Sequence, residues 1–213
     1  MNLPTKLTLS RIVIVVVMLI GLFTCDILYM AGILNMPTLG PVNVAYLVCF
    51  VLFIIASITD ALDGKIARKY NLVTDMGKFL DPVADKLLVN LTLIYLAIPH
   101  FGLDDVQAKI PLFCVIIMIG RDLIIDAFRL AAASKGSILA ANIFGKLKTV
   151  FQMIAIPMVF LNSWPFAYFD ADWNNYLRIC NIAIYIATAM SLISLIIYLK
   201  QNWHILLEKK END

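Results

Sequence analysis

Aspartates are concentrated in one short stretch of the chain, at Asp60, Asp63, Asp75, Asp81 and Asp85. Apolar runs lie on both sides of this stretch, at residues 44–58 and 87–98. A single acid placed at the depth of the hydrocarbon core already costs several kcal/mol or forces the surroundings to rearrange. So much charge at the meeting point of two apolar segments therefore indicates a functional site.

The spacing of these acids would bring four of them together. In helices, Asp60 and Asp63 are separated by three positions and share a face, and Asp81 and Asp85 are separated by four and do the same. Two antiparallel helices joined by a short turn near Asn71 would point the four carboxylates at one another. Two like charges about 5 Å apart repel by roughly 3 kcal/mol at an effective dielectric constant near 20. Such a cluster needs a cation.

Hard divalent cations match these ligands. Carboxylate oxygens suit Mg²⁺ or Mn²⁺, and no His or Cys is near enough in the sequence to favour zinc. A pair of ions held by carboxylates suits phosphoryl chemistry, because it neutralises pyrophosphate oxygens and stabilises developing charge. Gly64 and Gly77 would let a ligand or a neighbouring backbone approach closely.

The acidic stretch carries a family resemblance. It contains D-x-x-D-G-x-x-A-R, eight further residues, and G-x-x-x-D-x-x-x-D, with every fixed position matched between Asp60 and Asp85. This pattern resembles the signature of the CDP-alcohol phosphatidyltransferases, which are homodimeric membrane enzymes. The resemblance implies that the metal ligands are Asp60, Asp63, Asp81 and Asp85, and that Asp85 also acts as general base. It implies that CDP-diacylglycerol is held by Thr5, Thr8, Gly64, Arg68, Thr74 and Gly77.

The composition is that of a membrane protein. Of the 213 residues, 62% are hydrophobic and only 15% are charged. A helix needs about 20 apolar residues to cross a bilayer, and an open sheet edge cannot face lipid. We therefore predict an all-α integral membrane protein, a single domain over residues 1–213, whose six transmembrane helices fall at residues 12–30, 44–61, 79–98, 110–133, 143–161 and 176–199.

The first ten residues or so precede the first predicted span. The first apolar run could be a secretory signal, but it continues to Met30, lacks a small-x-small cleavage site and is followed by further spans. We interpret the preceding segment as a short interfacial stretch, with Lys6 and Arg11 at headgroup level.

Basic residues set the expected orientation. With six spans and an inner N-terminus, the outer loops receive only Lys109 and Arg178, while almost every other Lys and Arg falls on the inner side. Both termini and the acidic stretch are then cytoplasmic. The four cysteines are scattered singly through apolar runs, which is typical of small buried side chains rather than of a metal or redox site.

A second polar group lies near the inner ends of the fourth and fifth predicted spans, at Arg129, Lys135, Lys146 and Lys148. One interpretation is a basic collar that attracts anionic lipid. The other is a pocket for a phosphate-bearing acceptor. The runs G-R-D-L-I-I-D-A-F-R-L-A-A-A and G-K-L-K-T-V-F-Q resemble the second half of phosphatidylglycerophosphate synthases, and this resemblance implies that the acceptor is sn-glycerol 3-phosphate.

Arg121 and Asp122 fall near the middle of the fourth predicted span, where a charged pair is expensive. Two roles stay open for them, an architectural ion pair that includes Asp126 or a neighbouring helix, and direct contact with substrate. Their distance from the inner surface favours the architectural role.

The resemblance implies one reaction in the bacterial cytoplasmic membrane, with the active site facing the cytoplasm. The phosphatidyl group of CDP-diacylglycerol would pass to the primary hydroxyl of sn-glycerol 3-phosphate, with Mg²⁺ or Mn²⁺ as cofactor, in a homodimer surrounded by membrane lipids and without nucleic acid. One alternative is a sibling transferase whose acceptor is serine, inositol phosphate or a lipid. Another is a cation transporter, although transporter sites are expected near the midplane of the membrane.

Overall fold

The structure is a computed structural model of the chain. It describes residues 2–35, 37–70, 74–98, 109–134, 143–170 and 172–207, and within these ranges it does not describe the side chains of residues 3, 4, 61, 63–68, 75, 78 and 204–207. The described residues form an all-α fold with one short hairpin, β1 Thr38–Leu39 and β2 Val42–Asn43. Gly40 turns the hairpin at a φ of 61°, a conformation that favours glycine.

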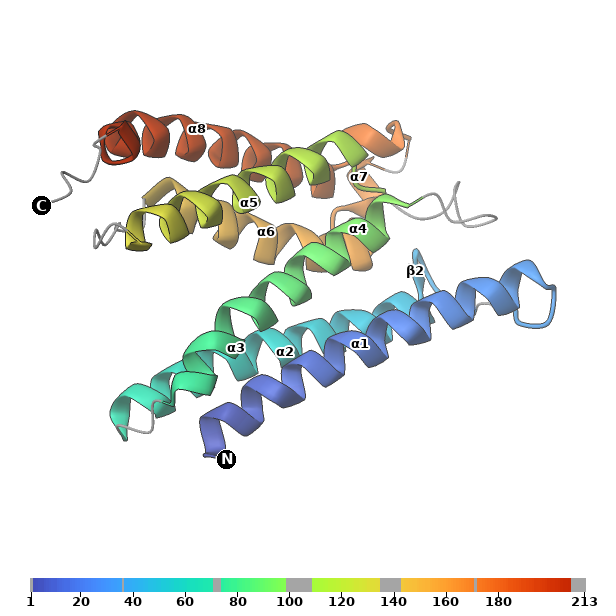
Figure 1. The fold of residues 1–213 in the computed structure, drawn as a ribbon. Coiled ribbons are helices and arrows are strands. Elements are labelled where there is room, and N and C mark those ends of the chain that lie inside the picture. Colours follow the sequence, from blue (N-terminus) through green and yellow to red (C-terminus); the bar gives the residue numbers. More distant parts are fainter. Residues whose placement is uncertain are drawn as a thin grey trace, which may run out of the picture.

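Six long helical segments account for most of the chain (Figure 1). The third of them joins an α-helix, a π-helical stretch and a second short α-helix, with Pro82 inside the first part. The elements are α1 Leu3–Met30, α2 Val44–Lys69, α3 Asp75–Lys86, η1 Leu87–Leu91, α4 Thr92–Ala97, α5 Leu112–Ser134, α6 Ile143–Phe160, α7 Ala167–Asp170, η2 Asn175–Leu177 and α8 Ile179–Leu207.

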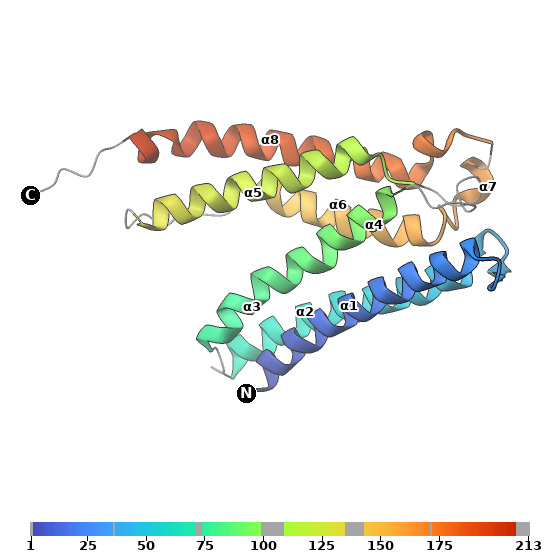
Figure 2. The same ribbon diagram turned by 45° about the vertical axis from the view of Figure 1, so that its right-hand side comes forward.

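The helices form two groups. In one group α1 packs against α2 and α3, and in the other α8 packs against α5 and α6. The α3–η1–α4 segment runs from the first group to the second, so that the groups meet around α4 and separate toward α3 in both views (Figures 1 and 2). The start of α1, the end of α2, the end of α5 and the end of α8 all lie at one end of the molecule, on the left in Figure 1.

Aromatic packing joins the two groups where they meet. The ring of Tyr46 on α2 lies 6.3 Å from that of Tyr95 on α4 and 6.1 Å from that of Phe160 on α6. The ring of Phe53, two turns further along the same face of α2, lies 6.3 Å from that of Phe160. All four residues are buried, and aromatic pairs at such separations contribute about 1 kcal/mol each beyond their burial.

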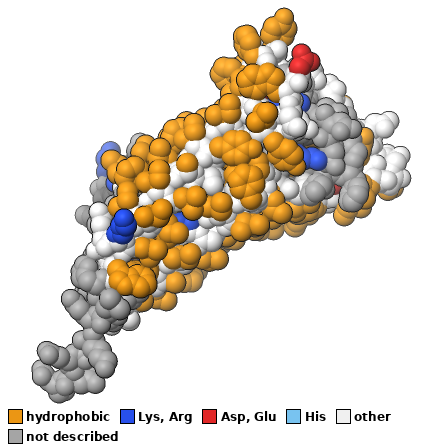
Figure 3. Space-filling view, turned by 90° about the horizontal axis from the view of Figure 1, so that it is seen from above, with side chains coloured by type: hydrophobic (Ala, Val, Ile, Leu, Met, Phe, Trp, Pro, Cys, Tyr) orange, Lys and Arg blue, Asp and Glu red, His pale blue; other side chains and the backbone are white. Residues whose placement is uncertain are grey.

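The outer surface is strongly apolar. Orange hydrophobic side chains cover most of the face in Figure 3, with few charges between them. Among the described residues, three helices are long and apolar enough to cross a membrane, Thr5–Met30, Ile143–Phe160 and Ile179–Trp203, and a shorter apolar helix covers Val44–Asp60. The all-α prediction is confirmed. The prediction of six spans stays a prediction. The third predicted span begins within α3, which contains several charged residues.

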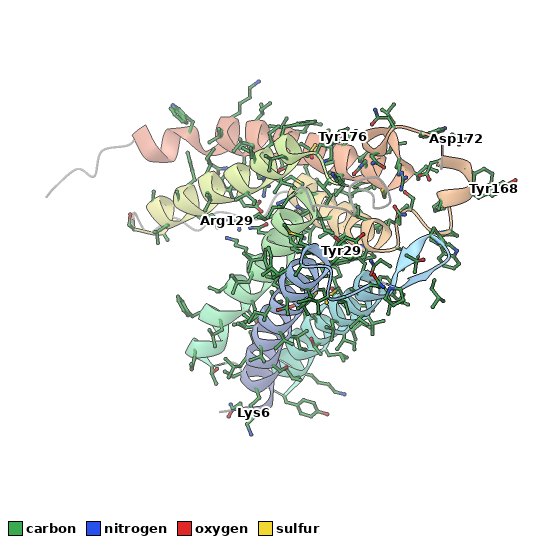
Figure 4. All side chains as sticks on the ribbon, turned by 90° about the vertical axis from the view of Figure 1, so that its right-hand side faces the viewer. Lys6, Tyr29, Arg129, Tyr168, Asp172 and Tyr176 are labelled. Carbon is green, nitrogen blue, oxygen red and sulfur yellow. The ribbon has the colours of Figure 1, made fainter. Side chains whose placement is uncertain are left out.

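The N-terminal segment differs from the prediction. It is not a separate interfacial stretch, because α1 continues without a break from Leu3, with proline in its first turn, where proline suits a helix start. Lys6 is exposed and projects from the end of the molecule (Figure 4). Arg11, in contrast, is fully buried, and its depth in the membrane stays a prediction.

Candidate active site

Asp60 and Asp85 converge on a buried guanidinium. Asp60 lies in the last third of α2 and Asp85 near the end of α3, and Nη1 of Arg11 lies 2.6 Å from Oδ1 of the first and 2.8 Å from Oδ1 of the second. Both acids keep partial exposure, 37% and 52% of their side chains, whereas Arg11 has none. One cation from α1 thus draws together two carboxylates from different helices, as the predicted convergence requires.

The same face of α1 holds the third acid. Thr8, one turn before Arg11, donates its hydroxyl to Oδ1 of Asp81 at 2.9 Å. Thr5, one turn earlier still, lies 3.0 Å from Thr74 through their Oγ1 atoms. These three α1 side chains are all buried. Thr8 thus contacts one of the acids and Thr5 contacts Thr74, while their contact with CDP-diacylglycerol stays a prediction.

Thr74 and Gly77 shape the start of α3. Thr74 is the N-cap, and its Oγ1 accepts a hydrogen bond from the backbone N–H of Gly77 at 3.0 Å. A Cβ atom added at Gly77 would lie 3.0 Å from that oxygen and 3.5 Å from Oγ1 of Thr5. The predicted close approach at Gly77 is thus a contact with these two threonines.

Some predicted residues fall outside what the structure describes. Asp63, Gly64 and Arg68 belong to α2, but nothing is described of their side chains, and Lys135 and the turn at Asn71 lie outside the described residues. Among the described side chains, no three from His, Cys, Asp or Glu are close enough to hold one metal ion. The four-aspartate ligand set stays a prediction.

A cavity of about 330 Å³ opens beside Asp60 and Asp85. Side chains from α2, α3, α5 and α6 line it, so it lies between the two helix groups. Its charged lining combines the two acids with four cations and two further acids, namely Lys86, Arg121, Arg129, Lys148, Asp122 and Asp126. Carboxylates and cations therefore face one another across one space.

Arg121, Asp122 and Lys148 form a cluster on the wall opposite Asp60 and Asp85, in which Lys148 is buried and the other two are partly buried. Asp122 accepts from Nη1 of Arg121 at 2.9 Å and from Nζ of Lys148 at 2.5 Å. Arg121 also donates through Nη2 to Oγ of Ser194 on α8 at 2.5 Å. Lys148 is 5% exposed at its side chain, so it is not part of a headgroup collar. The expected pairing of Arg121 and Asp122 with a neighbouring helix is confirmed, and both also line the cavity.

A second cavity of about 220 Å³ adjoins this cluster. Arg121, Arg129 and Lys146 line it together with Thr149 and Tyr198. Arg129 lies with its guanidinium 5.9 Å from the ring of Tyr198, and Figure 4 shows it on the side of α5 that looks toward α3. The predicted acceptor residues Arg129, Lys146 and Lys148 are therefore gathered around two neighbouring cavities.

Lys86 and Asp126 form an ion pair between α3 and α5. Both side chains are 41% exposed. Lys86 follows Asp85 directly in the sequence and lines the same cavity, and this pair connects it to α5. Asp126 pairs here with Lys86, and the ion pair of Arg121 is made by Asp122 instead.

Sequence reasoning missed Arg11, Lys86 and Arg121 as residues of the site. Arg11 belongs to the buried positions of α1, which recur at helical spacing through Thr8, Arg11, Val15, Met18 and Leu22, but α1 is too uniformly apolar for its sequence to mark this face. The place of Lys86 and Arg121 at the cavity depends on how α3 and α5 pack.

Comparison with known proteins supports the resemblance over nearly the whole chain. A sequence profile described as CDP-alcohol phosphatidyltransferase matches residues 1–193. A Bacillus subtilis protein named CDP-diacylglycerol–glycerol-3-phosphate 3-phosphatidyltransferase is 39% identical over 206 residues, which cover 96% of this chain and 97% of that protein. A Mycoplasma pneumoniae protein of the same name is 37% identical over 210 residues, 94% of this chain and 87% of its own.

A relative with another name is also similar. An Oryza sativa subsp. japonica protein named cardiolipin synthase (CMP-forming) is 34% identical over 215 residues, which cover 98% of this chain and 59% of that protein. With its apolar helices and a family match that includes the acidic stretch, this chain is a membrane protein that belongs to the CDP-alcohol phosphatidyltransferase family.

Proposed function

We propose that this protein transfers the phosphatidyl group of CDP-diacylglycerol to the primary hydroxyl of sn-glycerol 3-phosphate, giving phosphatidylglycerophosphate and CMP. The observation that carries the proposal is the 330 Å³ cavity in which Asp60 and Asp85 face Arg129 and Lys148. Acids that can hold a metal-bound diphosphate and cations that can hold a second phosphate then lie in one space. The names of the bacterial relatives support the same reaction.

The metal site would consist of Asp60, Asp63, Asp81 and Asp85. The family generally depends on a divalent metal, and the oxygen-only donors fit Mg²⁺ or Mn²⁺. Two of the carboxylates, Asp60 and Asp85, already meet at Arg11 from different helices, and Thr8 of the same helix bonds to Asp81. A pair of ions bound there would neutralise the diphosphate and the charge that develops on CMP.

The donor substrate would be seated by residues at the inner ends of α1, α2 and α3. Thr5, Thr8, Thr74 and Gly77 lie together around the start of α3, and Gly64 and Arg68 belong to the end of α2. We assign these six residues to CDP-diacylglycerol. Its acyl chains would remain in the bilayer, beside the apolar surface of the helices.

The acceptor would be held by Arg129, Lys135, Lys146 and Lys148. Asp85 would take the proton of the primary hydroxyl, and that oxygen would form a bond to the phosphorus that carries the diacylglycerol. The bond from this phosphorus to CMP breaks, and CMP leaves with the negative charge, which Arg68 would help to stabilise.

The placement in the membrane follows the charge pattern. We propose six spans with both termini and the cavity on the cytoplasmic side of a bacterial membrane, and a homodimer as the working form. The end of the molecule that gathers the start of α1, the end of α2 and the α5 and α8 ends (Figure 1) is the end richest in Lys and Arg.

A sibling transferase is the second candidate, and the rice relative named cardiolipin synthase favours it. Its acceptor would be a lipid rather than a soluble phosphate ester. The buried Lys148 and the partly buried Arg121 argue for an anionic acceptor, because a zwitterionic acceptor such as serine would not need them.

An acceptor panel tests the proposal. Purified protein with CDP-diacylglycerol and Mg²⁺ is given glycerol 3-phosphate, serine, inositol phosphate or phosphatidylglycerol, and CMP release is followed. We expect release with glycerol 3-phosphate alone, and its loss when EDTA removes the metal. Release that requires phosphatidylglycerol or serine would instead establish the sibling reaction, and no release with any acceptor would refute both.

A further inference from the structure

Asp122 takes no part in the chemistry proposed above, although it bonds to both Arg121 and Lys148 on the cavity wall opposite Asp60 and Asp85. Its Oδ1 atom accepts from Arg121 of the same helix and its Oδ2 atom from Lys148 of α6. The carboxylate is 15% exposed at its side chain. Each of its two oxygens thus fixes one cation, and the two cations come from neighbouring helices.

Arg121 is also fixed from two other directions. Its Nη2 atom donates to Ser194 of α8. A Cβ atom added at Gly145 of α6 would lie 2.9 Å from the same nitrogen, closer than side-chain carbons come to a nitrogen without displacement. The absence of a side chain at position 145 therefore provides the space that the guanidinium occupies.

The position of these cations links the two cavities. Arg121 lines both of them, and Lys148 lines the one that contains Asp60 and Asp85. Two cations held side by side with little exposure would be costly without a counter-charge. Asp122 offsets one of the two charges, so that Arg121, Asp122 and Lys148 together present a net single positive charge at a fixed place.

We propose that Asp122 is a positioning residue, which holds Arg121 and Lys148 on the wall opposite Asp60 and Asp85 so that both bind the phosphate of the acceptor. Gly145 keeps the space for this arrangement. Arg121 would then bind the phosphate of the acceptor as well as form a structural ion pair. This inference rests on the proposed function, since it concerns the acceptor of that reaction.

Asp122→Asn tests the role of the carboxylate. The amide keeps one oxygen acceptor, but its NH₂ group would face the donor of either Arg121 or Lys148, so one cation loses its fixed place. We expect the KM for glycerol 3-phosphate to rise about 10-fold, the size of one lost charged hydrogen bond. The KM for CDP-diacylglycerol and the affinity for Mn²⁺, measured by electron paramagnetic resonance, should stay within about twofold. Asp122→Glu should recover part of the loss.

Gly145→Ala displaces Arg121 without altering Asp122. The matched control is Gly120→Ala on α5, where an added Cβ meets nothing within 4 Å. We expect the first variant to raise the KM for glycerol 3-phosphate as Asp122→Asn does, and the second to keep the wild-type value. If Asp122→Asn does not fold, Gly145→Ala tests the placement of Arg121 and Asp122→Glu tests the role of the carboxylate.

The outcomes separate the two proposals. Wild-type protein that releases no CMP with glycerol 3-phosphate contradicts the proposed function. Turnover by the wild type, together with an unchanged acceptor KM in both variants, contradicts the positioning role alone. A parallel loss of acceptor, CDP-diacylglycerol and Mn²⁺ binding also contradicts it, because that pattern is the result expected of a purely structural residue.

Discussion

At the scale of single residues, the acids of this site depend on a cation that no motif includes. Arg11 bridges Asp60 and Asp85 through one nitrogen, and Thr8 bonds to Asp81 one turn away. A buried guanidinium between two carboxylates offsets repulsion that would otherwise push α2 and α3 apart. The acidic pattern could be predicted from its spacing, whereas its counter-charge lies some fifty positions earlier and depends on the packing of α1.

Arg11→Ala should destabilise the protein, and a divalent ion should restore part of the loss. The variant leaves two partly exposed carboxylates without their shared donor, which we expect to lower the free energy of unfolding by about 2 kcal/mol. Thermal unfolding in detergent with and without Mg²⁺ measures both effects, because Mg²⁺ supplies a positive charge at the same acids.

Lys6→Ala is the matched control, since Lys6 lies on the same helix and is exposed. This variant should have the same unfolding temperature as the wild-type protein, both with and without Mg²⁺. Equal unfolding temperatures for Arg11→Ala and Lys6→Ala would show that the buried ion pairs contribute nothing to stability.

Asp85→Asn should remove turnover without unfolding the protein. The amide cannot take the proton of the acceptor hydroxyl, and loss of a general base typically costs about 10²- to 10⁴-fold in rate. CMP release measures the rate, and Mn²⁺ affinity separates the loss of the base from the loss of a metal ligand. Asp172→Asn, an exposed acid at the far end from Lys6 (Figure 4), serves as the control. Near-normal rates for Asp85→Asn would remove the base assignment.

At the scale of elements, the sequence predicted the positions of the helices better than their character. Apolar runs predicted α5 Leu112–Ser134 and α6 Ile143–Phe160 to within about two residues, because lipid demands long, uninterrupted apolar segments. They could not predict the π-helical stretch Leu87–Leu91 within the third segment. That stretch, L-L-V-N-L, carries no Gly or Pro that would mark it in the sequence.

The start of α3 is an element whose geometry can be tested with one methyl group. A Cβ at Gly77 would press on the N-cap oxygen of Thr74, and loss of an N-cap costs about 1 kcal/mol. We expect Gly77→Ala to lower the unfolding temperature and to raise the KM for CDP-diacylglycerol. Gly21→Ala, where an added Cβ meets nothing within 4 Å, should do neither. Identical behaviour of the two variants would show that the close approach at Gly77 is unimportant.

At the scale of the whole molecule, the distribution of charge and the fold both distinguish one end of the helix bundle from the other. The helix ends that carry most Lys and Arg lie together at one end, and polar contacts such as Asn162 with Arg178 and the carbonyl of Pro41 gather at the other. The asymmetry could be predicted from the sequence by counting basic residues. How the groups separate around the cavity could not, because this depends on contacts distant in sequence.

Cysteine labelling in intact cells tests this orientation. A membrane-impermeant maleimide should label Tyr168→Cys, whose position is exposed and lies outside in the proposed topology. It should leave Ser134→Cys at the end of α5 unlabelled until the membrane is opened. Both reporters are placed in a chain whose native cysteines, three of which are buried, are replaced by serine. The reverse labelling pattern would overturn the proposed topology.

The aromatic contact of Tyr46, Tyr95 and Phe160 closes the molecule at one end only. If the proposed function is correct, this asymmetry lets the two substrates enter from different phases. CDP-diacylglycerol would enter laterally from the lipid leaflet, and glycerol 3-phosphate would enter from the aqueous phase. The lipid substrate does not have to leave the bilayer, and the soluble substrate does not have to enter it. An enzyme with this shape can react a lipid with a water-soluble substrate without forming a pore across the membrane.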